Sequence, residues 1–249
     1  MDWLTDPFSF DFMQRALAGG VLAVLTTSVV GTWVILRGLA FMGDALAHGV
    51  LPGIALALLL DINPMIGAAV AAVVMVGAIS LVHRTTRLSE DTAIGLLFVG
   101  MLALGVVLIS RSGSFAVDLV AILFGDVLGT SSSDLWAQGV VAAVALGGVV
   151  LFYRPLLVLS FNEQKAATLG LRPRLFHLVM MGLITLAVVA SFPTVGALLV
   201  FGLLIAPPAT AVLMARRVPT VMLTAAVLGV GEVAGGLLLS YHLDTAAGA

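Results

Sequence analysis

Long apolar runs dominate this chain, and short polar or turn-forming stretches separate them. A bilayer core requires roughly 20 apolar residues in helical form. The pattern therefore predicts an all-α, polytopic helical membrane protein with about eight transmembrane helices, at residues 16–36, 43–60, 62–82, 92–110, 134–153, 176–192, 195–215 and 219–241. Val117–Gly129 is apolar but too short to span, so we expect a half-helix whose ends are covered by protein or water.

Prolines predict interruptions within two of these spans. Pro52 and Gly53 predict a kink or break in the middle of the span 43–60. The sequence "APPAT" at 206–210 predicts a break in the span 195–215, which would free carbonyl groups to line a path.

The composition agrees with a membrane protein. Hydrophobic residues make up 61% of the chain and charged residues only 10%, whereas a soluble domain has about 25% charged residues. The absence of cysteine excludes disulfides and thiolate metal sites. A net charge of −2 gives no reason to expect a nucleic-acid partner. We see no repeat or linker, so we expect residues 1–249 to form one transmembrane domain with a short lead-in at 1–15.

Basic residues predict the orientation, because arginine and lysine concentrate in cytoplasmic loops. They cluster at 83–91, 154–174 and 216–217. Placing all three clusters in the cytoplasm agrees with the predicted spans, and it leaves the N-terminal residues and Val117–Gly129 outside. Arg15 and Arg111 are exceptions.

An acid and an imidazole interrupt the apolar run 37–60, at Asp44 and His48. Residues i and i+4 share one face of a helix, so these two side chains can hold one divalent cation, such as zinc, manganese or iron. The alternatives are a local hydrogen bond that satisfies two buried polar groups, or a proton relay. Ionisable residues inside a membrane are costly and usually face a cavity, which favours a transport role.

Two further candidates lie in the last predicted span. Glu232 is mid-span in "LGVGEVAGGLLLS", where an unpaired carboxylate is strongly disfavoured. We expect it to face the cavity close enough to Asp44 and His48 to share a metal; a structural hydrogen bond across a dimer is the alternative. His242 at the outer end of this span is a weaker metal-ligand candidate, and plain interfacial polarity explains it as well.

The longest internal polar segment covers residues 154–177. Its middle predicts a short helix at Asn162–Leu169, capped by Asn162 and ended by Gly170. This helix either belongs to an ordinary solvated loop or docks on a cytoplasmic partner.

Several stretches resemble the membrane subunits of bacterial ABC importers for zinc, manganese and iron. The resemblance covers nearly the whole chain in order and is carried by "VILRGLAFMGDALAHGVLPGIALA", "EDTAIGLLF" (90–98), "ILFGDVLGTSSSDL" (122–135), "FNEQKAATLGL" (161–171) and "VGALLVFGLLIAPPATA" (195–211). The opening "MDWLTDPFSFDFMQRALAGG" and "GTWVILRG" look most like zinc permeases.

The resemblance implies a type II ABC-importer fold in the bacterial cytoplasmic (inner) membrane. It implies a two-fold dimer with a second copy of the chain, two cytoplasmic ATP-binding subunits and an extracytoplasmic metal-binding protein. The transported ion would be Zn²⁺, or Mn²⁺ or Fe²⁺, with no cofactor bound permanently. Residues 154–175 would hold the segment that couples to the ATPase, with contacts from Asn162, Glu163, Lys165, Ala167 and Gly170.

The chain departs from this family at its end, because members continue past a segment like "SYHLDTAAGA" into another apolar helix. We expect that helix to be missing here or dispensable. The chain also lacks a G-x-x-x-x-G-K-[ST] motif, so we expect a transport subunit that is not itself an enzyme.

Two other functions compete with ATP-driven import. An ion- or proton-coupled secondary transporter could use Asp44, His48 and Glu232, but it predicts inverted repeats, and we see none. A purely structural membrane subunit would leave the Asp44–His48 pair unexplained.

Overall fold

A computed structural model describes residues 7–110, 124–125, 129–243 and 245. These residues contain helices and no strands, so the predicted all-α class is confirmed. The predicted half-helix Val117–Gly129 falls largely outside the described residues. The elements are η1 Pro7–Ser9, α2 Asp11–Leu36, α3 Ala40–Gly49, α4 Leu51–Leu59, α5 Pro64–Thr85, α6 Glu90–Ile109, α8 Ser132–Leu151, α9 Tyr153–Phe161, α10 Glu163–Thr168, α11 Pro173–Met214 and α12 Val218–Leu243.

Helix α11 contains two predicted spans, 176–192 and 195–215, in one element of 42 residues. It is interrupted at Gly196, whose φ of 72° and ψ of 169° belong to a region that essentially only glycine occupies. Gly196 therefore divides α11 into a first arm, residues 173–195, and a second arm, residues 197–214.

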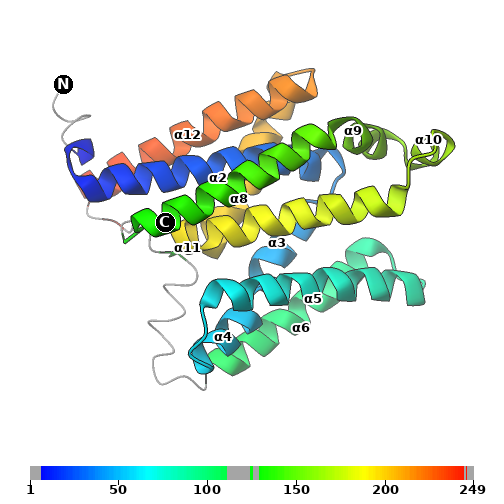
Figure 1. The fold of residues 1–249 in the computed structure, drawn as a ribbon, viewed down its shortest axis with the longest axis horizontal. Coiled ribbons are helices and arrows are strands. Elements are labelled where there is room, and N and C mark those ends of the chain that lie inside the picture. Colours follow the sequence, from blue (N-terminus) through cyan, green and yellow to red (C-terminus); the bar gives the residue numbers. More distant parts are fainter. Residues whose placement is uncertain (1–6, 111–123, 126–128, 244, 246–249) are drawn as a thin grey trace.

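The chain reverses direction between these two arms. Thr194 packs beside Gly19 near the start of α2, and Leu204 packs beside Gly31 near the end of α2. The second arm is therefore parallel to α2. Figure 1 shows α11 leaving α10 and α12 beginning at the same end of the molecule, so both ends of α11 lie at that end.

A contact between two aromatic rings shows whether the chain crosses the membrane an even or an odd number of times. Phe10 lies just before α2 and Tyr241 lies in the last turn of α12, and their ring centroids are 6.3 Å apart. The helix array thus starts and finishes at the same end, which requires an even number of crossings. The described residues form seven segments long and apolar enough to cross a membrane, with α3 and α4 counted together. The reversal within α11 raises this to the eight predicted crossings.

The predicted break at 206–210 is wrong. Pro207 and Pro208 lie inside the second arm of α11, which stays helical around them. Both pack against glycines of neighbouring helices. A Cβ added at Gly31 would lie 3.1 Å from Cγ of Pro208, and one added at Gly229 would lie 3.4 Å from Cγ of Pro207. Membrane helices tolerate proline where neighbouring helices compensate for the lost backbone bond.

The predicted interruption at Pro52 is confirmed. Helices α3 and α4 are separate elements that meet at Val50, and Pro52 occupies the first turn of α4, where a missing N–H costs little. Immediately afterwards, Gly53 of α4 meets Gly67 of α5 so closely that a Cβ on either residue would overlap the other's carbonyl oxygen. This Gly53–Gly67 crossing holds the two backbones together without intervening side chains.

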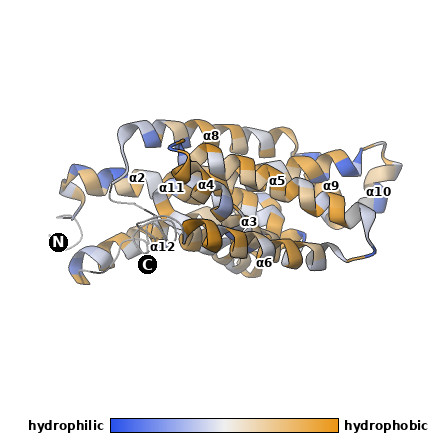
Figure 2. Cartoon of the chain, turned by 90° about the horizontal axis from the view of Figure 1, so that it is seen from below, coloured by the Kyte–Doolittle hydropathy of each residue, from blue (hydrophilic) through white to orange (hydrophobic). Residues whose placement is uncertain are grey.

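Figure 1 shows two groups of helices. Helices α2, α8, α11 and α12 form one group, and α3 to α6 form the other. Helix α11 belongs to the main hydrophobic core and also contacts α3 and α5, so it joins the groups. Hydrophobic residues extend along the bundle, whereas hydrophilic ones gather mainly toward its two ends (Figure 2).

Candidate metal site and coupling segment

Helix α3 places Asp44 and His48 on one face, as the i, i+4 spacing predicts. The distance from Asp44 Oδ1 to His48 Nε2 is 3.4 Å, and the side chains of Asp44 and His48 are 23% and 17% exposed. A hydrogen bond between nitrogen and oxygen is usually no longer than about 3.2 Å. Two ligands about 2.1 Å from one ion at a tetrahedral angle stand about 3.4 Å apart. The geometry therefore suits a shared cation better than a tight hydrogen bond.

Aromatic rings on α6 and α3 surround His48. The Phe98 ring of α6 lies 5.8 Å from the imidazole, edge-on, and 5.9 Å from the Phe41 ring, which precedes Asp44 on α3. Gly95, one turn before Phe98, leaves space for Phe41, because a Cβ there would lie 3.4 Å from the ring. The imidazole of His48 thus packs against the apolar ring of Phe98, which restricts the orientations that the imidazole can adopt.

The second imidazole nitrogen, Nδ1 of His48, is buried, and no described residue forms a hydrogen bond with it. Metal-bound histidines usually donate this second N–H to an acceptor that fixes the tautomer. The described part of one chain supplies no such acceptor. Packing against Phe98 is therefore the contact that restricts the His48 ring.

Glu232 and His242 do not join this pair. Helix α12 packs on α2 and α11, whereas α3 packs mainly on α6 and α11. Glu232 is exposed on α12 beside Gly231 and Gly235, around which no heavy atom would meet an added Cβ within 4 Å. Among the described residues, no three histidine, aspartate or glutamate side chains gather closely enough to hold a metal. The described part of one chain therefore does not bring Glu232 to Asp44 and His48, and a metal shared with Glu232 stays a prediction.

His242 lies at the other end of α12 from the chain's basic turn at 216–217. Its ring contacts that of Tyr241 at 5.3 Å. Because Tyr241 also contacts Phe10, which precedes α2, His242 belongs to the end of the bundle where the helix array starts. This position at the end of the bundle agrees with plain interfacial polarity, the alternative that the sequence left open for His242.

The predicted helix near Asn162 is confirmed as α10. The Asn162 side chain accepts a hydrogen bond of 2.8 Å from the backbone N–H of Lys165, which satisfies one of the free donors at the helix start. Gly170, with φ of 76°, follows the helix in the left-handed conformation that ends many helices. Glu163 is the first residue of α10.

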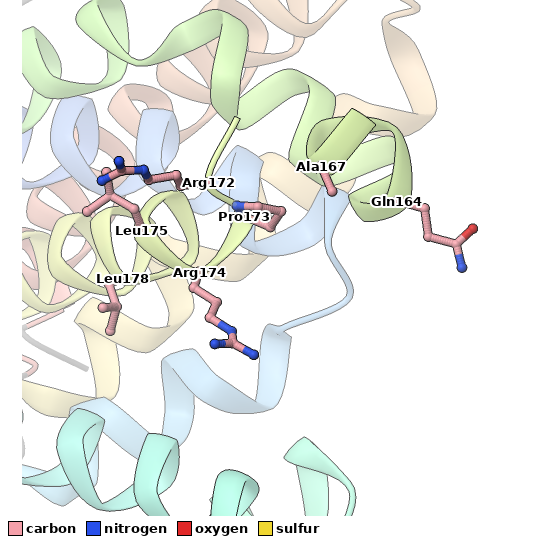
Figure 3. A pocket seen from close by; sticks show the side chains of 7 residues that line it. All are labelled: Gln164, Ala167, Arg172, Pro173, Arg174, Leu175 and Leu178. Carbon is pink, nitrogen blue, oxygen red and sulfur yellow. The ribbon is translucent and has the colours of Figure 1, made fainter. Parts of the chain in front are cut away.

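Side chains of α10 and of the start of α11 line an open surface pocket of about 650 Å³ (Figure 3). The residues that line it are Gln164, Ala167, Arg172, Pro173, Arg174, Leu175 and Leu178. Ala167, a predicted coupling residue, thus lies on its wall, while the adjacent Ala166 is buried at 1% exposure. Helix α10 is anchored by Ala166 and presents Lys165 and Ala167 outward.

Two parts of this region escaped the sequence analysis. Phe41 and Phe98 lie on different helices, so no local pattern links them, although Phe41, Asp44 and His48 do share the i, i+3, i+7 spacing of one helix face. Helix α9, Tyr153–Phe161, leads into α10 and was expected to be part of a polar segment. Its run "LLVLSF" was the available signal.

The model of the ABC 3 transport family matches residues 9–249. This chain belongs to the ABC 3 transport family. The resemblance found in the sequence is therefore confirmed, and the chain is a permease of the ABC metal importer class.

Known relatives in the family and a solved structure support this assignment. The manganese transport system membrane protein MntC of Halalkalibacterium halodurans is 40% identical over 97% of this chain and 82% of its own length. A Haemophilus influenzae protein named "Probable iron transport system membrane protein" is 34% identical over 100% of this chain and 91% of its own. The structure of PsaBC from Streptococcus pneumoniae in complex with Fab matches with a TM-score of 0.88 and 34% identity, covering 99% of this chain and 89% of that chain.

Proposed function

We propose that this permease imports manganese, with Asp44 and His48 as ligands for the ion in transit. The observation that carries the proposal is the 3.4 Å separation of the two donor atoms on one face of α3. One oxygen and one nitrogen donor form a mixed, rather hard site that suits Mn²⁺, Fe²⁺ or Zn²⁺. The names of the similar proteins favour manganese, with iron as the alternative. We therefore propose manganese in place of zinc, which we had expected from the opening residues of the sequence.

The described part of one chain supplies too few ligands for a closed metal site at Asp44 and His48. Two donors leave at least two positions of a tetrahedral ion, and four positions of an octahedral ion such as Mn²⁺, to water or to another molecule. A second copy of the chain around a two-fold axis would contribute a second carboxylate and a second imidazole. We therefore propose a homodimer in the bacterial cytoplasmic membrane, with its transport path along the axis and with an extracytoplasmic metal-binding protein delivering the ion.

Uptake into vesicles tests the metal site directly. The permease, reconstituted with its ATP-binding subunit, should take up Mn²⁺, and Asp44→Asn and His48→Gln should each reduce uptake at least tenfold. Asp11→Asn and His177→Gln make the same chemical changes elsewhere on the chain and should leave uptake unchanged. Competition by Zn²⁺ and Fe²⁺ ranks the metals. Normal Mn²⁺ uptake by both site variants would remove Asp44 and His48 from the path.

We further propose that α10 docks on a cytoplasmic ATP-binding subunit and transmits its motion. Support comes from its capped, outward-facing geometry, with Lys165 and Ala167 exposed around a buried Ala166. Ala167→Pro should uncouple ATP hydrolysis from transport, because proline inside a helix costs about 3 kcal/mol. Ala167→Ser, which keeps the helix, is the control. Binding of Mn²⁺ to the purified permease should stay the same, and transport-coupled hydrolysis that also stays the same would contradict the docking role.

A further inference from the structure

Trp33 connects the transmembrane core to the segment that leads into α10. Its side chain is 1% exposed and lies in the last turn of α2. Its ring meets the Tyr153 ring edge-on, with centroids 5.5 Å apart and an angle of 69° between the ring planes. Tyr153 is the first residue of α9, and only Asn162 separates α9 from α10 (Figure 1). The Trp33–Tyr153 contact therefore joins α2 to the α9–α10 segment.

Helix α9 is held firmly at its start and along its length. It has nine residues and is therefore about 14 Å long. Leu156 and Leu159 fix it to the core, with exposures of 0% and 3%. Phe152, directly before α9, contacts Phe176 of α11 with ring centroids 6.0 Å apart. The start of α9 thus contacts both α2 and α11, so a movement of α10 that tilts α9 acts on both helices.

The Trp33–Tyr153 contact depends on the packing of two rings. Nε1 of Trp33 is buried, and no described residue forms a hydrogen bond with it. A buried indole N–H usually has an acceptor that fixes its position. Without one, the edge-on packing of the rings sets where Tyr153 lies against Trp33. Phenylalanine at position 33 keeps a ring for this contact, and leucine does not.

Gly31, two residues before Trp33, lies at the start of a series of contacts that ends beside Asp44. A Cβ on Gly31 would overlap the carbonyl oxygen of Leu204, so α2 and the second arm of α11 touch through their backbones. The Leu204 side chain lies against Gly43, where an added Cβ would be 2.7 Å from its Cδ2 atom. Gly43 directly precedes Asp44. Close-packed interiors compress little and pass on displacement, so a shift of α2 at Trp33 reaches the backbone of Asp44.

We propose that Trp33 is a positioning residue for transport, which passes a movement of α9 and α10 through α2 to Asp44. This inference rests on the proposed docking of α10 on the ATP-binding subunit. Trp33 contacts neither α10 nor the ion, since its described ring partner is Tyr153. Its loss should therefore change how many ATP molecules are hydrolysed per ion, with no change in the binding of the subunit or of Mn²⁺.

ATP hydrolysis and Mn²⁺ uptake, measured together in vesicles that hold the permease and its ATP-binding subunit, test this role. Trp33→Leu should raise the ATP hydrolysed per Mn²⁺ at least fivefold, and Trp33→Phe should stay within twofold of wild type. Trp136→Leu makes the same change at a position on α8 that is 78% exposed and should leave the ratio unchanged. Tyr153→Leu should act like Trp33→Leu, and the double variant should be no worse than either, because both remove one contact.

Subunit recruitment and Mn²⁺ binding to the purified permease should match wild type in all these variants. An unchanged ratio in Trp33→Leu and Tyr153→Leu would overturn the proposal, as would equal increases in Trp33→Leu and Trp136→Leu. Additive effects in the double variant would show two separate packing defects and would also overturn it. If Trp33→Leu does not fold, Tyr153→Leu at its half-buried position decides the matter.

Failure of the docking role gives a different result. Ala167→Pro would then keep a normal ratio of ATP hydrolysed to Mn²⁺ taken up. If only the present proposal fails, Ala167→Pro raises that ratio while Trp33→Leu and Tyr153→Leu leave it as in wild type.

Discussion

We predict that two similar substitutions in α5, one at the Gly53–Gly67 crossing and one away from it, have opposite effects on stability. Gly67→Ala adds one methyl group between α4 and α5. Its Cβ would overlap the carbonyl oxygen of Gly53 and would lie 2.7 Å from the Cβ of Ala57. Both obstacles are atoms that cannot rotate away, so the two helices must separate. Gly77→Ala makes the same change on the same helix, where no heavy atom lies within 4 Å of the new Cβ.

The expected magnitudes follow from two opposing effects. Alanine is favoured over glycine inside a helix by about 1 kcal/mol, and this gain applies to both variants. Overpacking a close contact costs about 1–3 kcal/mol, and this cost applies only at Gly67. We therefore expect Gly77→Ala to be stabilising by up to about 1 kcal/mol, and Gly67→Ala to be as much as about 2 kcal/mol less stable than wild type.

Thermal unfolding in one detergent, followed by circular dichroism, measures this difference. For a chain of this size, 1 kcal/mol corresponds to about 2–4 °C in Tm. Gly67→Ala should unfold below wild type and Gly77→Ala at or above it. Equal Tm values for the two variants would refute the close approach of α4 and α5, because helix propensity alone cannot separate them.

Three more substitutions test other parts of the structure. Asn162→Ala should remove the cap of α10 at a cost of about 1 kcal/mol, seen as faster hydrogen exchange confined to that helix; unchanged exchange would contradict the cap. Gly196→Ala should destabilise the chain by about 1–3 kcal/mol, because alanine is strained at this φ and ψ, while Gly202→Ala in the same helix should not lower Tm; equal effects would contradict the strain. Phe98→Ala should weaken Mn²⁺ binding several-fold by releasing the His48 ring, whereas Phe98→Leu should largely restore it; unaltered calorimetric affinity in both would exclude this positioning role.

The sequence predicted those features that depend on local chemistry. Apolar runs near 20 residues revealed the spans because the bilayer imposes that length on a helix. The cap at Asn162 and the end at Gly170 are properties of single residues, and both appear where expected. Asp44 and His48 share a face because a helix repeats every 3.6 residues.

Features that depend on tertiary contacts could not be read from the sequence. Pro207 and Pro208 looked like a break, yet glycines on α2 and α12 leave space for them and the helix continues. The actual interruption is at Gly196, one of 27 glycines in the chain, most of which lie in ordinary helix. Glu232 was expected near Asp44, but which face of α12 meets α2 and α11 depends on packing that no local pattern specifies.

Because α11 reverses direction, it links the α10 end of the molecule to the surroundings of Asp44 on α3. Four residues separate its first arm from α10, and this arm runs to Gly196 toward the opposite end of the molecule. Its second arm returns past α3, where Leu204 packs against Gly43 beside Asp44. A straight helical arm of this length acts as a lever: a tilt of about 5° at the α10 end displaces the Gly196 end by about 3 Å. That displacement exceeds a metal–ligand bond of about 2.1 Å. Under the proposed docking of α10, a small rotation of that helix would move the interruption at Gly196, from which the second arm leads back to Leu204 and Gly43 beside Asp44.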